Sequence, residues 1–315
     1  MARISLVRKG SSGSDCQSRG LRLRSLLSKK VKESIIEYSL LAIATFSIFI
    51  VFFIFFYLFK ESLPAFHKLG WEIFSMDFQG KMGLGGAIMG SLLVTFGALL
   101  IAYPIGIGGG IFLSEVSPNW LRRFLKPTIE LLAGIPSVIY GFVGAILLVP
   151  FLKNTFDMIS GISLLAGGMI IGVMTLPIII SIVDDSLKTV PRDLREASLA
   201  LGATPWQTTK KVSFPAASSG IFAAATLGIG KALGETMAVL MVVTAITSTP
   251  DPVYDVFRGG PVLTSLIGGL MGEAYGVKVN VLFAAGVFLF IIVSVLCVVS
   301  ELAQRHVKRK FRGSK

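Results

Sequence analysis

Residues 38–59 have the sequence YSLLAIATFSIFIVFFIFFYLF, an unbroken run without a charged side chain. A helix of about 20 apolar residues, each rising roughly 1.5 Å, is long enough to cross the hydrocarbon core of a bilayer. This stretch therefore predicts a membrane-spanning helix. It lies too deep in the chain, and is too long, for a cleaved signal peptide, and no small-residue cleavage site follows it.

Five further stretches have the length and apolar character of a span, and they cover residues 86–113, 130–152, 161–183, 219–247 and 279–302. The composition agrees, because 53% of the chain is hydrophobic and 15% is charged, whereas soluble domains carry about 25% charged residues. The mean hydropathy is +0.77. We therefore predict an all-α polytopic membrane protein with six transmembrane helices. Glycines are frequent in the second and fourth spans, which favours close helix packing there.

Lysine and arginine are distributed unevenly between the two sides of this arrangement. The tails 1–37 and 303–315 and the loops 115–129 and 184–218 hold nine, six, three and five of them, whereas the alternate loops 60–85, 153–160 and 248–278 hold three, one and two. Loops rich in Lys and Arg stay on the cytoplasmic side. Both termini are therefore expected to be cytoplasmic. The net charge of +12 is accounted for by topology and does not call for a nucleic-acid partner.

This topology predicts three parts of the chain. Residues 1–34 are expected to form a basic cytoplasmic tail without order, because the first twenty or so are polar and rich in Gly and Ser. Residues 35–305 are expected to form the membrane domain, with a long cytoplasmic loop at 184–218. Residues 306–315 are a second basic cytoplasmic tail. A short interfacial helix is also expected within residues 260–273.

Motifs for nucleotide, metal or disulfide chemistry do not occur in the sequence. Gly230-Lys231 lacks the Ser or Thr and the first Gly of a phosphate-binding P-loop. His67 and His306 are isolated, and Cys16 and Cys297 form no ligand or disulfide pattern. We expect no enzyme activity and no cofactor bound by this chain, so any energy for transport comes from a partner.

The loop 184–218, DDSLKTVPRDLREASLALGATPWQTTKKVSFPAAS, is longer than most connections without structure of their own. Pro191 suits a first helical turn, and the following segment consists of good helix formers. Gly202 is suited to end that helix. A second short run begins near Trp206 and closes at Pro215. We therefore predict two short helices, joined by a glycine turn, that project into the cytoplasm.

The spacing in this loop resembles the EAA loop of ABC importer permeases, E-A-A-x3-G-x9-I-x-L-P. Glu196, Ala197, Gly202 and Pro215 match the pattern. The departures keep size or apolar character, and they are Ser198, Val212 and Phe214. The resemblance implies that these residues couple the permease to an ATPase subunit, which docks on the loop.

Three further segments make the chain similar to the C-type permease subunits of Pst phosphate importers, that is, PstC-like. They are IAYPIGIGGGIFLSEV at 101–116, ELLAGIPSVIYGFVG at 130–144 and GIGKALGETMAV at 228–239. This resemblance implies a type I ABC importer permease fold in a bacterial inner membrane. The implied partners are an A-type permease subunit, two ATPase subunits that hold ATP and Mg, and an extracytoplasmic phosphate-binding protein. The structural motif in the third span comprises Pro136, Ser137, Tyr140 and Gly141.

Lys231 and Glu235 are ionisable residues near the middle of the fifth span. Such groups cost roughly 2.5–3.5 kcal/mol each on insertion scales and normally face a cavity or a partner. Spaced i,i+4 on one helix, they are expected to share a face and to neutralise each other. Together with Thr236 they are placed on the substrate pathway. The alternative is a structural ion pair. The family more often has Arg at position 231, and Lys lacks its bidentate geometry.

Three other functions remain open at this stage. The same fold serves other oxyanions such as molybdate or sulfate. A proton-coupled secondary transporter would use Glu235 as a proton carrier. A membrane scaffold without transport is disfavoured, because it gives no reason for two costly charges inside a span.

Overall fold

The computed structural model of this chain describes residues 12–243 and 248–312, with side chains placed for 34–78, 80–243 and 248–306. It divides into two compact units, Met1–Tyr57 and Leu58–Lys315. The boundary between these two units falls inside the first predicted span. Within the described ranges the chain contains helices and no strands, as predicted for an all-α protein.

The described elements, in chain order, are α1 (Ser12–Leu69), the 3₁₀ helix η1 (Gly70–Phe74), α2 (Phe78–Lys81), α3 (Gly85–Ile111), the π-helix η2 (Phe112–Val116), α4 (Asn119–Ala133), α5 (Ser137–Val143), the π-helix η3 (Gly144–Leu148), α6 (Val149–Thr155), α7 (Leu164–Lys188), α8 (Arg192–Ala200), α9 (Pro205–Thr208), the π-helix η4 (Thr209–Ser213), α10 (Phe214–Ala216), α11 (Ser218–Gly234), α12 (Met237–Val242), α13 (Leu263–Leu270) and α14 (Val277–Arg312).

The first unit consists, in its described part, of the N-terminal portion of α1. This helix begins at Ser12, so it includes residues 12–34 of the predicted basic tail. The segment 21–32, LRLRSLLSKKVK, is rich in Leu, Arg and Lys, which have high helix propensity. Residues 1–11 lie outside the described part of the chain.

Five helical stretches are long and apolar enough to cross a membrane, and a sixth is present if one bent pair is counted as a single span. The five are Ser34–Phe74, Gly85–Val116, Ser137–Thr155, Leu164–Lys188 and Val277–His306. The bent pair is Pro205–Ala216 with Ser218–Gly234, at an angle of 69°. The described residues thus agree with six spans but correct the bounds of the third and the fifth.

The third span begins at Ser137 and not at residue 130. Glu130 lies in the amphipathic helix α4, and residues 134–136 separate that helix from α5. Pro136 has an extended backbone (φ −56°, ψ 137°), and a proline also disfavours the helical conformation in the residue before it. The break therefore follows from Pro136, and Glu130 does not cap the span.

The fifth span is not one continuous helix. α11 ends at Gly234, and Glu235 is extended (ψ 121°) before α12 starts. Residues 244–247, at the end of the predicted span, lie outside the described part of the chain. The break falls within the segment that holds the two predicted pathway charges.

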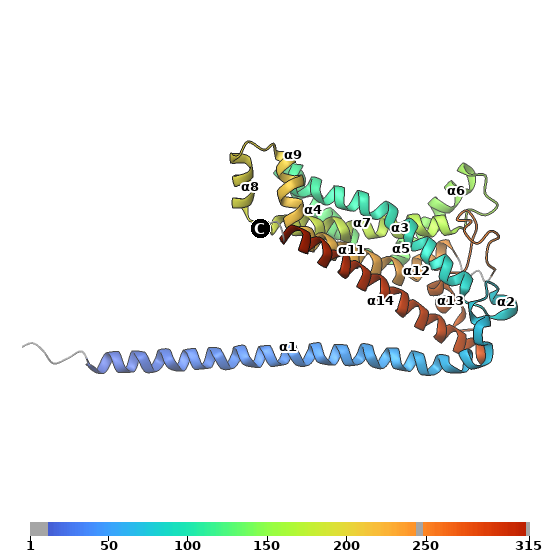
Figure 1. Ribbon diagram of the computed structural model, residues 1–315, viewed down its shortest axis with the longest axis horizontal. Coiled ribbons are helices and arrows are strands. Elements are labelled where there is room, and N and C mark those ends of the chain that lie inside the picture. Colours follow the sequence, from blue (N-terminus) through green and yellow to red (C-terminus); the bar gives the residue numbers. More distant parts are fainter. Residues whose placement is uncertain (1–11, 244–247, 313–315) are drawn as a thin grey trace, which may run out of the picture. The chain divides into compact units, whose positions relative to one another are not determined.

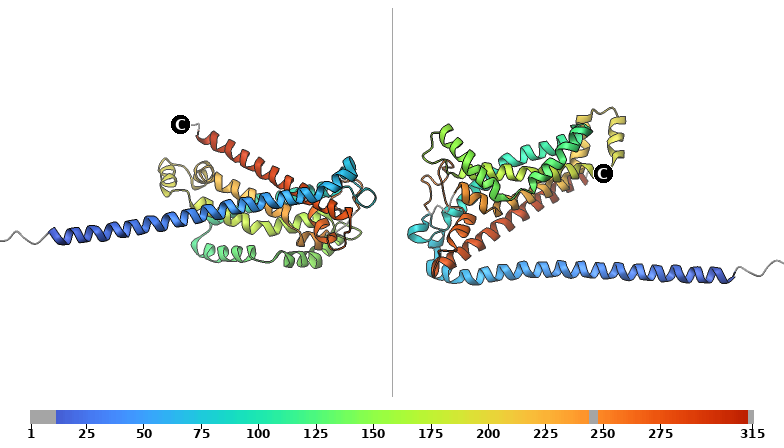
Figure 2. Two further views of the ribbon diagram at one scale, coloured as in Figure 1. Left: turned by 90° about the horizontal axis from the view of Figure 1, so that it is seen from below. Right: turned by 180° about the vertical axis from the view of Figure 1, so that it is seen from behind.

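The loops of the second unit are sorted onto two sides, as the charge count predicted. Arg122 in loop 115–129 contacts Asp184 at the start of loop 184–218. On the other side, Thr249 Oγ1 donates a hydrogen bond to the Met76 carbonyl. The rings of Phe156 and Phe257 lie 5.4 Å apart on that same side. Figures 1 and 2 show α8, α9 and the C-terminal part of α14 together at one end of the second unit, with α6 and α13 at the other.

Helices α3 and α7 are packed closely along their length, and glycines make this possible. A Cβ atom at Gly106 would lie 2.7 Å from Ile179 Cγ2, and one at Gly110 would lie 2.6 Å from Val183 Cβ. The buried residues around this pair also come from α11 and α12. In lipid, such contacts act through van der Waals packing because the apolar solvent supplies little hydrophobic driving force.

We predict that alanine lowers stability at one glycine of α3 and not at another. Gly110→Ala forces a methyl group against Val183 and should lower stability by about 1–3 kcal/mol, as overpacking does. Gly108→Ala is the matched control, because a Cβ at Gly108 meets nothing within 4 Å. The measurement is the thermal melting of the purified full chain in detergent. Equal melting temperatures for the two variants would contradict this account of the α3–α7 contact.

Candidate functional site

The loop at 184–218 forms the predicted pair of short helices, although its first five residues complete α7. α8 begins after Pro191, and Gly202 adopts a left-handed conformation (φ +84°) in the turn that follows α8. Thr204 caps α9, because its Oγ1 accepts from the Gln207 N–H, and the Gln207 side chain accepts from the Thr204 N–H. Proline and a capping box thus position the two helices, which we call the α8–α9 hairpin (residues 192–208).

The hairpin is held together internally and has an exposed apolar surface. Ser198 Oγ and Thr208 Oγ1 are hydrogen-bonded at 3.0 Å, which joins α8 to α9. Leu201 is 90% exposed and Trp206 62% exposed. Large apolar side chains exposed on a projecting hairpin indicate a protein contact. Glu196 and Ala197 are exposed on the same hairpin.

Pro215 lies at the other end of this region. It belongs to α10, which ends at Ala216, and it is partly buried. Helix α11 begins at Ser218, and the helical axis bends by 69° between the two. The second run therefore ends one residue after Pro215, and the bend places the hairpin at an angle to the span that follows.

Lys231 and Glu235 are paired, but not on one helix face as predicted. The Lys231 Nζ atom lies 3.5 Å from Glu235 Oε2, across the end of α11. Glu235 Oε1 also accepts a hydrogen bond of 3.2 Å from the Ala238 N–H at the start of α12. Glu235 is extended because its carboxylate caps this new helix. The Thr236 hydroxyl contacts the Gly234 carbonyl at 3.5 Å.

The two charges differ in exposure. The Glu235 side chain is 7% exposed, whereas the Lys231 side chain is 40% exposed. A Cβ atom at Gly230 or Gly234 would meet nothing within 4 Å, so space is open beside the lysine. The arrangement leaves a cation accessible from that space and holds its counter-charge inside the protein.

The predicted structural motif at the start of α5 lies next to the break between α11 and α12. The Tyr140 hydroxyl donates a 2.9 Å hydrogen bond to the Leu132 carbonyl, across the gap between α4 and α5. A Cβ at Gly141 would lie 2.8 Å from Ala238 Cα. Ser137 is the first residue of α5, directly after Pro136. The fold therefore brings the α5 motif against α12, whose first turn Glu235 caps.

The fold does not bring the predicted coupling residues to the charge pair. Figure 1 shows α8 at one end of the second unit and α12 away from that end. Glu196, Ala197 and Gly202 thus belong to a separate surface from Lys231 and Glu235. Any influence of one on the other has to pass through the helices between them.

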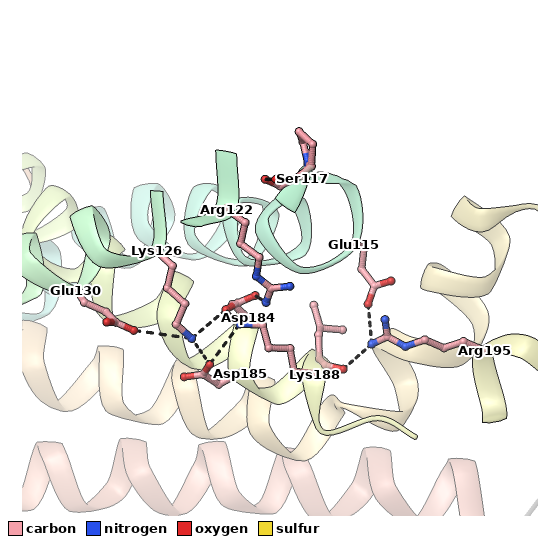
Figure 3. Close-up of polar contacts among 11 residues, drawn as sticks. Glu115, Ser117, Arg122, Lys126, Glu130, Asp184, Asp185, Lys188 and Arg195 are labelled. Atoms are coloured by element: carbon pink, nitrogen blue, oxygen red, sulfur yellow. Dashed lines mark hydrogen bonds and ion pairs between the residues drawn. The ribbon is translucent and has the colours of Figure 1, made fainter. Parts of the chain in front are cut away.

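A cluster of charges around Asp184 was missed by the sequence analysis, and Figure 3 shows it. Asp184 is fully buried (0% exposed) at the end of α7. Its carboxylate contacts Arg122 Nη2 at 2.7 Å, Lys126 Nζ at 3.1 Å and Lys188 Nζ at 2.5 Å. This cluster joins α4 to α7. The i,i+4 spacings of 122 with 126 and 184 with 188 were the available indications.

Lys126 is the most connected cation of this cluster. It contacts Asp185 as well as Asp184, and Glu130 lies 3.8 Å from its Nζ. Burial alone would lower the pKa of Lys126, but hydrogen bonds and attraction to Asp185 and Asp184 outweigh it and raise that pKa above its usual value. The amine therefore stays charged at physiological pH.

A second ionic contact joins the hairpin to the spans. Arg195 Nη2 in α8 lies 2.9 Å from Glu115 Oε1 in η2, and it donates a 2.6 Å hydrogen bond to the Leu187 carbonyl near the end of α7. Figure 3 shows both contacts converging on the guanidinium. The separation of 80 residues between the two charges gave no local pattern from which to predict the pair.

Comparisons with known proteins agree with this arrangement. The probable ABC transporter permease protein YqgH of Bacillus subtilis is 44% identical over 217 residues, which cover 68% of this chain and 69% of the relative. The phosphate transport system permease protein PstC of Pasteurella multocida is 34% identical, covering 71% and 75%. The probable PstC of Methanocaldococcus jannaschii is 32% identical, covering 84% and 91%. These relatives confirm the PstC-like resemblance.

Solved structures agree on the fold. An inward-facing structure of the MetNI methionine ABC transporter matches with a TM-score of 0.55 and 25% identity, covering 71% of this chain and 95% of that one. A bacterial alginate ABC transporter matches with a TM-score of 0.61 and 18% identity, covering 89% and 98%. The fold is that of a type I ABC importer permease. A family model described as "Binding-protein-dependent transport system inner membrane component" matches residues 103–313. The chain belongs to this family of binding-protein-dependent transport system inner membrane components.

Proposed function

We propose that the chain is the channel-forming permease subunit of an ATP-driven importer of inorganic phosphate. The observation that carries this proposal is the Lys231 side chain, which is 40% exposed beside open space in an apolar span. A pathway for an anion needs positive potential where water is scarce. The relatives of this chain include proteins named as phosphate permeases, which supports phosphate over another anion as the substrate.

The same proposal assigns the surroundings of the subunit. The α8–α9 hairpin docks on a partner ATPase, which holds ATP and Mg, and its exposed Leu201 and Trp206 supply the apolar contact. A second, A-type permease subunit, two ATPase copies and an extracytoplasmic phosphate-binding protein complete the importer. The complex lies in a bacterial inner membrane, with both termini of this chain in the cytoplasm.

Uptake of radiolabelled phosphate by cells that depend on this importer tests the proposal. Uptake should stop when the P-loop lysine of the partner ATPase is replaced, and it should persist in the presence of an uncoupler. Excess unlabelled phosphate should compete, whereas sulfate and molybdate should not. Competition by molybdate or sulfate instead would reassign the substrate, and loss of uptake with the uncoupler alone would indicate proton coupling through Glu235.

The hairpin should depend on the backbone of Gly202. A β-branched residue in a left-handed conformation costs roughly 1–2 kcal/mol, which is a factor of about 5–30 in population. Gly202→Val should therefore leave membrane insertion intact but reduce co-purification with the ATPase and phosphate uptake. Gly202→Asn is the matched control, because Asn tolerates this conformation and a Cβ at this position meets nothing within 4 Å.

Co-purification of the ATPase with the two Gly202 variants decides whether this turn belongs to the coupling surface. Reduced co-purification for Val together with near-normal co-purification for Asn supports a coupling role. A Gly202→Val complex that assembles and transports normally would remove this turn from the coupling surface.

Removing the charge of Lys231 should abolish uptake even when its partner is neutralised. The informative variant combines Lys231→Leu with Glu235→Gln, because Gln retains an acceptor for the Ala238 N–H and no unpaired charge remains. Lys231→Arg keeps the cation and should retain most transport. The measurement is phosphate uptake normalised to assembled complex. Normal uptake in the double variant would show that the pair is structural and would retire the contact with substrate.

A further inference from the structure

Arg195 connects three elements that are far apart in the sequence. It belongs to the projecting hairpin, whereas Glu115 lies in η2, one residue before its end, and Leu187 lies near the end of α7. One guanidinium group reaches both span ends, as Figure 3 shows. Both contacts are made by Nη2, which carries two N–H donors and can therefore serve two acceptors.

This contact is more sheltered than an ordinary surface ion pair. The Glu115 side chain is 11% exposed and that of Arg195 is 25% exposed. Glu115 Oε1 is buried and, among the described residues, has no aligned hydrogen bond, so Arg195 at ion-pair distance supplies its compensating charge. Exposed pairs contribute little, but removing one partner of a buried pair leaves a charge uncompensated.

Contacts continue from these span ends toward the charge pair. α3 and α7 are in close contact through Gly106 and Gly110. The Tyr103 hydroxyl on α3 donates a 2.7 Å hydrogen bond to the Ala225 carbonyl of α11. Lys231 lies further along that same helix. A displacement of the span ends is therefore passed through packed elements to the helix that carries the cation.

We propose that Arg195 is a positioning residue that fixes the α8–α9 hairpin to the ends of α3 and α7, so that movement of the hairpin is transmitted to both spans. This inference rests on the proposed function as an ATP-driven permease. Without the contacts of Arg195, the hairpin would be attached only by its two connecting segments. It would then rotate at the bend before α11 without moving α3. The ion pair removes that freedom.

Charge compensation alone is the competing explanation, and a double-mutant cycle separates the two. Arg195→Gln and Glu115→Gln each break the ion pair and leave one charge without its partner, and Arg195→Gln also removes the guanidinium donor of the hydrogen bond to the Leu187 carbonyl. The double variant leaves no unpaired charge, but it also lacks the ionic link. If compensation is the whole role, the double variant regains normal behaviour; if positioning is the role, it remains defective.

The experiment uses the complete importer reconstituted in proteoliposomes with its binding protein. The readout is radiolabelled inorganic phosphate imported per ATP hydrolysed. We expect this ratio to fall roughly 2- to 30-fold, the range typical of residues along a coupling network, in both single variants and in the double variant. The fall in Arg195→Gln should be at least as large as in Glu115→Gln, because only the former also loses the contact with Leu187. A loss that only reduced assembly would lower import and hydrolysis together and leave the ratio unchanged.

Arg305→Gln is the matched control. Arg305 pairs with Glu301 at 2.6 Å, but both residues lie on α14, so this pair joins no separate elements. Its ratio should equal that of the wild type. A normal ratio in the double variant, or a fall in only one single variant, overturns the positioning role. Should Arg195→Gln fail to assemble, the double variant decides, because it carries no unpaired charge.

A second readout separates this inference from the proposed substrate. Hydrogen exchange of the α8 amides in the assembled complex reports the attachment of the hairpin without any transport. We expect faster exchange in both single variants and in the double variant than in the wild type. If the wild-type complex imports no phosphate while α8 exchange responds in this way, the substrate assignment fails and the attachment stands. Unchanged exchange in all three variants overturns the inference.

Discussion

The absence of water in a bilayer core requires each backbone polar group there to find a partner within the protein. This requirement applies where the third span begins and where the predicted fifth span is broken. At the break before α5, the Tyr140 hydroxyl donates to the Leu132 carbonyl. At the break before α12, the Glu235 carboxylate accepts from the Ala238 N–H. In both places a side chain supplies a hydrogen bond at a helix end. The two places adjoin, because a Cβ atom at Gly141 of α5 would lie 2.8 Å from Ala238 Cα in α12.

The charges of the second unit serve two different ends, and burial distinguishes them. Asp184 is fully buried and contacts three cations, so it is compensated from several sides and joins α4 to α7. Lys231 has Glu235 as its ionic partner and keeps 40% of its side chain exposed. A fully enclosed cluster gives a rigid connection, whereas a partly exposed cation remains available to an anion. Glu235 therefore has two roles, as counter-charge and as helix cap.

The hairpin and the charge pair lie apart, so the spans between them determine how one affects the other. The closeness of α3 and α7 is set by glycines whose Cβ atoms would collide with Ile179 and Val183. Packed helices of this kind are displaced together and are not deformed individually. Arg195 attaches the hairpin to the ends of both helices, and the hydrogen bond of Tyr103 attaches α3 to α11. The packing thus supplies a continuous mechanical path.

Composition, hydropathy and the distribution of Lys and Arg were enough to predict the membrane class, the approximate spans and the sorting of the loops of the second unit, because these depend on the solvent around each segment. Local patterns were also enough for the α8–α9 hairpin, since Pro191 and Gly202 act on neighbouring backbone. The helical character of residues 12–34 and the two breaks at Pro136 and Glu235 were not predicted. Pro136 and Glu235 are each compatible with a continuous or kinked span as well as with a break, because neighbouring groups can satisfy the freed backbone, so the local pattern does not decide between these outcomes. The Asp184 cluster and the Arg195–Glu115 pair required tertiary structure for the same reason: their members are distant in sequence, and only the packing of α3, α4, α7 and α8 brings them within reach of one another.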